Sequence, residues 1–219
     1  MCNSNNPGLT LSSMRRFFLL IAAVVLLSAC GKAKEEAIAP GSRVLALGDS
    51  LTAGAGVVQE EAWPHLLAAR TGWIVVNGGV SGDTSAAALQ RLPALLEEYK
   101  PALVLVTLGG NDMLHHLPQT ETVANLKQAI AQIHARGAKT VLLATPQPSL
   151  AGAVFRNLSA PDFYREVAEE QQVPLIEDAV ADVLSDPQLK GDPLHPNAAG
   201  HALLSAKIHA ALQSIGYAH

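Results

Sequence analysis

Four short segments of the chain carry residue types that together could perform acyl transfer. In chain order they supply a hydroxyl, two amide donors and an acid–base pair: Gly48-Asp49-Ser50-Leu51, Ser81-Gly82-Asp83-Thr84, Gly109-Gly110-Asn111-Asp112 and Asp192-Pro193-Leu194-His195. A serine whose proton is taken by a histidine can attack a carbonyl carbon, and amide donors can then stabilise the oxyanion. The order of these segments predicts a serine nucleophile with its own base and oxyanion hole.

The first segment places Ser50 directly after an apolar run, residues 44–47. A serine on a tight strand-to-helix turn is exposed, and its own backbone N–H can face developing negative charge. The simpler interpretation is that Gly48 permits the turn and Ser50 only caps a helix. Thr52 stands where the G-x-S-x-G elbow of α/β-hydrolases has glycine, which disfavours that family.

The second and third segments are candidates for the oxyanion hole. Gly78, Gly79 and Gly82 let the backbone approach a ligand closely, and the Gly82 N–H could be a donor. Asn111 could add its side-chain amide, although an ordinary turn would also explain the segment around it. No G-x-x-x-x-G-K-[ST] string occurs, so a phosphate-binding loop is disfavoured.

The last segment provides the acid–base pair. Three-residue spacing on a proline-stiffened loop can bring the Asp192 carboxylate to Nδ1 of His195, which leaves Nε2 free to face a nucleophile. A surface turn before a helix is the alternative. Among the other polar residues, Asp49 could bond the nucleophile turn, Asp83 is expected to cap a helix and His201 to be exposed.

Alternating elements are expected to position these segments. Short, mostly continuous apolar runs predict five strands, at 44–47, 73–77, 103–108, 140–144 and 173–176. Helical patterns lie between them, and a final helix is expected over 198–215. This alternation predicts an α/β fold with a parallel sheet covered by helices on both sides, in which sites form beyond the carboxyl ends of the strands.

The N-terminus has the features of a secretory signal. Arg15 and Arg16 precede thirteen uncharged residues, too few for a membrane span of about 20. The run ends Leu27-Ser28-Ala29-Cys30-Gly31, which resembles a bacterial lipobox. We therefore expect a lipoprotein signal peptide at 1–29, lipidation at Cys30, a tether at 30–41 and one catalytic domain at 42–219. An ordinary cleavage site is the alternative, and the start codon is either Met1 or Met14.

Composition narrows the function further. The chain has 219 residues, 49% of them hydrophobic, which suits one well-buried domain. The net charge of −4, without a basic block, gives a nucleic-acid partner no electrostatic support. Removal of the signal would leave Cys30 as the only cysteine, so no internal disulfide is expected.

Taken together, the four segments resemble those of the SGNH (GDSL) hydrolase family. The resemblance runs from about Val44 to Gly200 and assigns the hallmark residues to Ser50, Gly82, Asn111 and His195, with Asp192 completing a triad. Within the family, the chain looks most like the bacterial periplasmic esterases that act as thioesterase, lysophospholipase and arylesterase. Residues 145–161 and 197–201 depart from that group, which leaves the length of the acyl substrate open.

The resemblance implies a three-layer α/β/α sandwich with a five-stranded, flavodoxin-like parallel sheet. It also implies hydrolysis of acyl, aryl or thio esters through an acyl-enzyme on Ser50, without a metal or cofactor. A carbohydrate O-deacetylase or an acyltransferase is the alternative on this scaffold, and a non-catalytic surface lipoprotein is a third reading. We expect a monomer, lipid-anchored in the bacterial envelope and facing the periplasm, at either the inner or the outer membrane.

Overall fold

Five parallel strands in the order β2-β1-β3-β4-β5 form the sheet of the computed structural model, which describes residues 36–149 and 157–219. The strands are β1 (Arg43–Gly48), β2 (Ile74–Gly79), β3 (Leu103–Thr107), β4 (Lys139–Leu143) and β5 (Leu175–Ile176). This is the flavodoxin-like order, so the predicted fold class is confirmed. All five predicted strands are present, and each of their ends lies within two residues of the predicted one.

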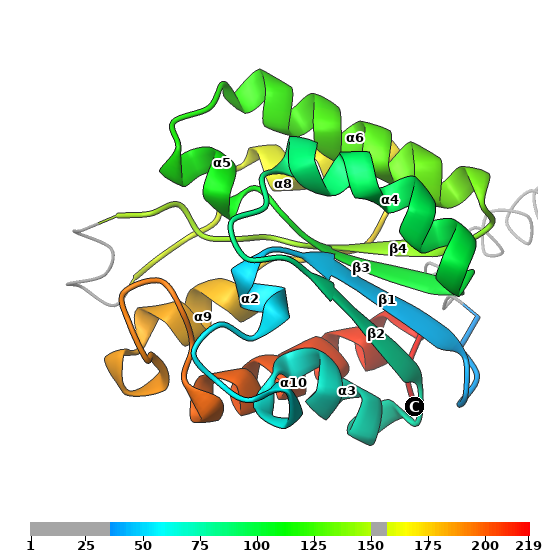
Figure 1. Ribbon diagram of the computed structural model, residues 1–219, viewed down its shortest axis with the longest axis horizontal. Helices are drawn as coiled ribbons and strands as arrows, with labels where there is room; N and C mark the ends of the chain where they lie inside the picture. Colours follow the sequence, from blue (N-terminus) through cyan, green and yellow to red (C-terminus); the bar gives the residue numbers. More distant parts are fainter. Residues whose placement is uncertain (1–35, 150–156) are drawn as a thin grey trace, which may run out of the picture. The chain divides into compact units, whose positions relative to one another are not determined.

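Helices cover both faces of the sheet (Figure 1). One face carries α4 (Ser85–Tyr99), α6 (Gln119–Ala135) and α8 (Phe163–Gln171), and the other carries α3 (Trp63–Thr71), α9 (Ala179–Ser185) and α10 (Ala198–Ile215). Two short helices, α2 (Ser50–Ala53) and α5 (Gly110–Leu114), follow β1 and β3 directly. Single 3₁₀ turns lie at Gln59–Glu61 and Pro187–Leu189.

The strand side chains alternate between two hydrophobic cores. Leu45 and Leu47 of β1 pack with α4, α6 and α8, whereas Val44 and Ala46 pack with α3, α9 and α10. All four side chains are fully buried. Because both faces are covered, the strands are apolar throughout rather than alternately polar, which is why their sequence shows continuous runs.

The final helix begins and ends where the sequence predicts. Asn197 caps its N-terminus by accepting from Gly200 N–H at 3.0 Å, and Gly216 ends it with φ 101°. The sequence did not single out α3, α8 or α9. Each of these helices has fewer than ten residues, which is too short for a repeating apolar pattern to be recognised in the sequence.

The compact unit starts at Glu36, ahead of the domain boundary expected at residue 42. Ile38 is buried, its N–H donates to Tyr217 O at 2.9 Å, and its carbonyl accepts from Trp73 Nε1. The last six residues of the expected tether are therefore part of the fold. The expected signal peptide and the lipidation site Cys30 lie outside the described residues. Within 36–149 and 157–219, no helix has both the length and the apolar character to cross a bilayer.

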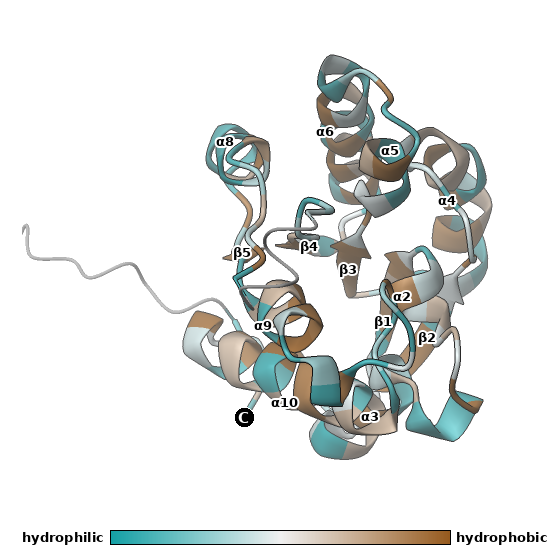
Figure 2. Cartoon of the chain, turned by 90° about the vertical axis from the view of Figure 1, so that its left-hand side faces the viewer, coloured by the Kyte–Doolittle hydropathy of each residue, from teal (hydrophilic) through white to brown (hydrophobic). Residues whose placement is uncertain are grey.

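The carboxyl ends of the strands meet at one edge of the sheet, which faces the viewer in Figure 2. β2 and β3 lie on either side of β1, so the connections after β1 and β2 leave toward opposite faces. Ligand sites of open α/β sheets form at such a reversal of strand order. The α2 and α5 turns both lie at this edge.

Candidate active site

Ser50 stands at the point where β1 ends and α2 begins. The turn is close-packed: a Cβ on Gly48 would lie 2.1 Å from Thr52 Oγ1 and 2.9 Å from Thr107 O, so only glycine fits. The helix cap is Asp49, whose Oδ1 accepts from Leu51 N–H at 3.0 Å. The interpretation of Ser50 as a helix cap is therefore wrong, and its hydroxyl is directed elsewhere.

The Ser50 hydroxyl meets His195, 145 residues further along the chain. Its Oγ lies 2.9 Å from His195 Nε2, and the other ring nitrogen, Nδ1, lies 2.8 Å from Asp192 Oδ2. The structure thus brings together the three residues that the sequence predicts as nucleophile, base and carboxylate. Since Nδ1 faces a carboxylate, it carries the proton and leaves Nε2 to accept from the serine.

The Asp192 carboxylate is held by its own loop. Its Oδ1 accepts backbone N–H bonds from Leu194 at 2.7 Å and from His195 at 2.9 Å. Desolvation raises the pKa of Asp192, but the hydrogen bond from the His195 ring and these backbone donors outweigh it, so the pKa lies below its ordinary value. The carboxylate is ionised at neutral pH and can stabilise an imidazolium beside it.

Asn197 closes the loop that carries Asp192 and His195. Its Nδ2 donates to Gln188 O at 2.9 Å and to Lys190 O at 3.3 Å, while its Oδ1 caps α10. Lys190 also forms an antiparallel bridge with Pro196. The two ends of the loop are therefore tied together, which fixes the imidazole without burying it. The sequence predicts a helix start at this position, but it gives no sign of these loop-closing bonds, which we call the Asn197 clamp.

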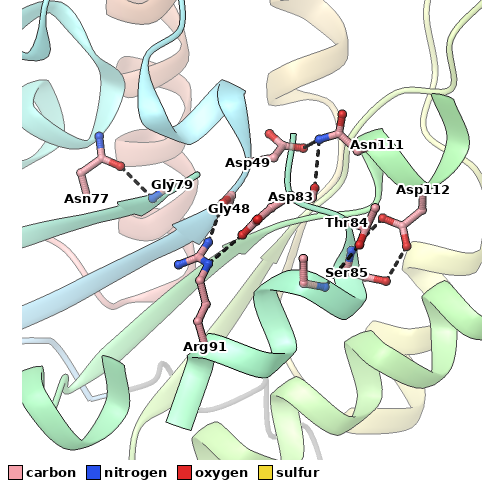
Figure 3. A network of polar contacts seen from close by, with 11 residues as sticks. Gly48, Asp49, Asn77, Gly79, Asp83, Thr84, Ser85, Arg91, Asn111 and Asp112 are labelled. Carbon is pink, nitrogen blue, oxygen red and sulfur yellow. Dashed lines mark hydrogen bonds and ion pairs between the residues drawn. The ribbon is translucent and has the colours of Figure 1, made fainter. Parts of the chain in front are cut away.

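Asn111 lies opposite the imidazole, in the first turn of α5. Its Nδ2 donates to Asp83 O at 2.9 Å and to Asp49 Oδ2 at 3.3 Å (Figure 3). Gly82 lies in the turn after β2 with φ +85°, and open space surrounds its Cα. Among the described residues, neither the Ser50 N–H nor the Gly82 N–H donates to another protein group. The three predicted oxyanion donors all line one cavity.

The other two glycines, Gly78 and Gly79, end β2 and have a different role from the one that the sequence suggested. A Cβ on Gly78 would contact Leu45 Cδ1 at 2.8 Å, and one on Gly79 would lie 2.2 Å from Ala53 N. These glycines let β2 pack tightly against β1 and α2. Of the three glycines, only Gly82 lines the cavity.

A polar network joins the strand ends on this side of the site (Figure 3). Arg91 of α4 pairs its Nε with Asp83 Oδ2 at 2.7 Å and donates from NH2 to Gly48 O at 3.0 Å. Asp83 was expected to cap α4, but the cap is Thr84, which accepts from Ala87 N–H at 3.2 Å. The Asp83 side chain instead links the turn after β2 to the end of β1 through Arg91.

Asp112 ties the start of α4 to α5. It is 2% exposed and accepts from Ser85 N–H at 2.8 Å, Ser85 Oγ at 2.5 Å and Thr122 Oγ1 at 3.2 Å. Asn125 Nδ2 donates to Ser85 Oγ in turn. Buried donors bond both oxygens of the Asp112 carboxylate. This carboxylate therefore holds the structure together next to Asn111.

Asp49 is the buried ionisable group closest to the nucleophile. Only 2% of it is exposed, and burial raises its pKa to about 6, although the Leu51 N–H bond and the charge of His195 oppose this rise. The sequence suggested a turn bond for Asp49, which the Leu51 contact confirms, but gave no sign of its contact with Asn111.

His201 was expected to be exposed but is fully buried against α3. Its Nδ1 accepts from Trp63 N–H at 3.4 Å, and burial lowers its pKa to about 4, with the charge of His195 adding to the effect. The error arose because α10 packs against α3, which the sequence did not reveal as a helix. A neutral ring in this position can support the helix that follows the acid–base loop.

An open cavity of about 500 Å³ extends from Ser50 and His195. Beyond the polar groups, much of its lining is apolar, and the leucines in it are Leu51, Leu114, Leu158, Leu184 and Leu194. Such a cavity suits a hydrocarbon or aromatic group placed next to the serine. Over the described part of the chain, no three His, Cys, Asp or Glu side chains gather as a metal site.

An α/β sandwich in which Ser50, His195 and Asp192 lie in hydrogen-bond contact beside the carboxyl ends of the strands has the architecture of a hydrolase. A model of the GDSL-like Lipase/Acylhydrolase family matches residues 46–203. The chain therefore belongs to this family of ester hydrolases, and the resemblance seen in the sequence is confirmed.

Curated relatives and solved structures support this assignment. An arylesterase of Vibrio mimicus is 36% identical over 176 residues, which cover 78% of this chain and 84% of the relative. Thioesterase 1/protease 1/lysophospholipase L1 of Escherichia coli K12 is 38% identical over 164 residues, 73% of this chain and 77% of the relative. The crystal structure of the esterase EstA from Pseudoalteromonas sp. aligns with a TM-score of 0.69 at 30% identity and covers 79% of this chain and 97% of its own.

Proposed function

We propose that the protein hydrolyses carboxylic esters through a covalent acyl-enzyme on Ser50, with His195 as general base and Asp192 as its partner. The observation that carries the proposal is the continuous line from Ser50 Oγ through His195 Nε2 and Nδ1 to Asp192 Oδ2, with steps of 2.9 and 2.8 Å. A serine is a weak nucleophile unless a base lies within hydrogen-bond reach, and this geometry supplies one.

In the first half of the reaction, Ser50 Oγ attacks the carbonyl carbon while its proton moves to His195 Nε2. The Asp192 carboxylate stabilises the imidazolium, and the oxyanion accepts from the Ser50 and Gly82 N–H groups and from Asn111 Nδ2. When the bond to the leaving group breaks, His195 returns the proton to it. Water then repeats the attack on the ester carbon, with His195 as base again, and releases the acid and free Ser50.

The cavity supports a substrate with an apolar acyl or aryl group. Leucines line the space beside the nucleophile, and among the described residues that line the cavity there is no lysine or arginine to bind a phosphate or a carboxylate. The relatives named arylesterase and thioesterase/lysophospholipase agree with this preference. Acetylated sugars would leave much of the apolar lining exposed to water, so we rank them below acyl and aryl esters.

The place of action that we propose is the bacterial envelope. Removal of residues 1–29 would leave Cys30 as the lipidated first residue, and the fold begins only six residues later, at Glu36. The protein would then be a lipid-anchored hydrolase facing the periplasm. Metabolic labelling with a fatty-acid analogue, compared between the wild type and Cys30→Ala, tests this part independently of the catalytic assignment.

The decisive experiment on the chemistry is Ser50→Ala, assayed with nitrophenyl esters of increasing acyl length. We expect the loss of essentially all ester turnover, because no other group can form the acyl-enzyme. Circular dichroism should show an unchanged fold, since within the described residues the Ser50 side chain bonds only the His195 ring, whose side chain is 22% exposed. Near-normal turnover by a clean Ser50→Ala preparation would refute the proposed mechanism.

A further inference from the structure

Asn111 has no uncommitted hydrogen for an oxyanion. Its Nδ2 carries two hydrogens, and the structure directs that nitrogen to Asp83 O at 2.9 Å and to Asp49 Oδ2 at 3.3 Å. A substrate carbonyl must therefore share one of these hydrogens. The Asp49 contact is the longer one, and Asp49 borders the cavity together with Asn111, so this hydrogen is the one within reach of a ligand.

The Asp49 carboxylate is well placed to control that hydrogen. One oxygen is fixed by Leu51 N–H at 3.0 Å, in the turn that carries Ser50, and the other faces the Asn111 amide. The peptide just before it is held as well, because Arg91 donates to Gly48 O. Nucleophile turn and oxyanion donor are thus connected through one buried side chain (Figure 3).

We propose that Asp49 is a positioning residue that orients the Asn111 amide for the oxyanion, a role that rests on the hydrolytic mechanism proposed above. The ionised carboxylate accepts from Asn111 in the free enzyme and keeps the amide plane fixed between itself and Asp83 O. As negative charge develops on the substrate oxygen, the second N–H is shared with it. Donors that are already oriented stabilise a transition state without the cost of reorganisation.

A purely structural role is the competing explanation, since Asp49 also caps α2. The two roles differ in how Asp49 and Asn111 combine. If Asp49 acts through Asn111, its replacement should matter only while Asn111 is present. If Asp49 only supports the α2 turn, its effect should be the same with or without Asn111.

The test is a double-mutant cycle with Asp49→Asn and Asn111→Ala, measured as kcat on a nitrophenyl ester. Asp49→Asn keeps the oxygen that accepts from Leu51 but turns an amide donor toward Asn111. We expect kcat to fall about 10²–10³-fold for Asn111→Ala, as for other oxyanion donors, and about 10- to 100-fold for Asp49→Asn, with KM little changed. In the Asn111→Ala background, Asp49→Asn should cost less than about threefold.

Each outcome has a separate meaning. Equal losses from Asp49→Asn in both backgrounds would overturn the positioning role while leaving the hydrolase mechanism intact. A normal kcat for Asn111→Ala would instead remove the oxyanion assignment within the proposed function. Asp49→Ser, which retains a capping hydroxyl but cannot reach Asn111, replaces Asp49→Asn if that variant folds poorly.

Asp112→Asn is the matched control. Asp112 is as buried as Asp49 and directly follows Asn111 in α5, but its contacts are with Ser85 and Thr122 rather than with the Asn111 amide. Its effect on kcat should therefore be equal in the presence and absence of Asn111. Non-additivity for Asp112→Asn as strong as for Asp49→Asn would show that the cycle reports general loosening, and would overturn the inference.

The pH profile of kcat for the wild-type enzyme tests the role of Asp49 without any substitution. The groups that act electrostatically on Asp49 are His195 before α10, Asp112 in α5 and Tyr164 in α8. Burial raises the pKa of Asp49 to about 6, so acidification should protonate Asp49 as well as the general base. The logarithm of kcat should fall with a slope approaching two on the acid side, and a slope of one in Asp49→Asn. A slope of one in the wild type would contradict the inference.

Discussion

The two halves of the site are built in opposite ways. The acid–base half is local: Asp192 and His195 belong to one short loop, and the contacts of the carboxylate span at most three residues. The oxyanion half is assembled from the ends of three strands, with contacts from Asn111 to Asp49 and Asp83 across 62 and 28 residues. The first carboxylate is half exposed, whereas Asp49 in the second half is buried.

The two halves of the site also stabilise their carboxylate charges differently. Backbone N–H groups and an imidazole stabilise Asp192 and lower its pKa, so the charged form is favoured at little cost. Burial of Asp49 raises its pKa to about 6, so its charged form is maintained against desolvation. We infer that the acid–base loop costs the folded state little free energy. The buried charge on the oxyanion side lowers the free energy of unfolding but fixes the arrangement of the donors.

Among the variants that test this contrast, Asp192→Asn is expected to have the largest effect, a fall in kcat. The asparagine oxygen would still accept from Leu194 N–H, but its NH₂ group would face the ring and favour the wrong tautomer of His195. We expect kcat to fall about 10³–10⁴-fold, with an unchanged melting temperature because the side chain is half exposed. Steady-state kinetics with circular dichroism measure both. A loss of less than tenfold would mean that another group supports the imidazole.

The second effect concerns stability, and Asp49→Asn tests it. The pKa of Asp49 is about 6 in the folded protein and near 3.8 when unfolded, so the folded state binds the extra proton between these values. The wild type therefore loses stability as the pH rises through this window, by about 3 kcal/mol. The free energy of unfolding of Asp49→Asn, relative to the wild type, should increase by that order between pH 3.5 and 7.

Urea unfolding of both proteins across this pH range provides the measurement. Other groups titrate alike in the two proteins, so the difference isolates residue 49. A difference that stays constant with pH would show that burial does not penalise the Asp49 charge. The contrast between the two halves of the site would then disappear.

The smallest effect is expected from Asn197→Asp, which tests the clamp on the acid–base loop. Aspartate still caps α10 through Gly200 N–H, but it cannot donate to Gln188 O or Lys190 O. We expect kcat to fall about tenfold, as expected when about 1.4 kcal/mol of positioning is lost, with KM nearly unchanged. Gln188→Ala, which removes an exposed side chain but keeps the carbonyl that accepts from Asn197, is the control and should change kcat less than twofold. Equal effects of the two variants would argue against the clamp.

Much of the fold followed from local patterns. Continuous apolar runs located all five strands, and Asn197 and Gly216 set the ends of α10 as residue types predict. The short helices α3, α8 and α9 escaped detection, and His201 was misplaced for that reason, since its burial depends on α3. A helix of only two or three turns shows too few apolar repeats for a clear periodicity in the sequence.

The sequence alone determined which chemistry the chain can perform. Ser50, Gly82, Asn111, Asp192 and His195 were predicted as site residues because their segments follow a strand or precede the last helix, where open α/β sheets form their sites. Only the tertiary structure decided what orients them: Asp49 on Asn111, Arg91 between Asp83 and Gly48, and Asn197 across its loop. These contacts join segments distant in sequence, and their distances and burial exist only after the chain has packed.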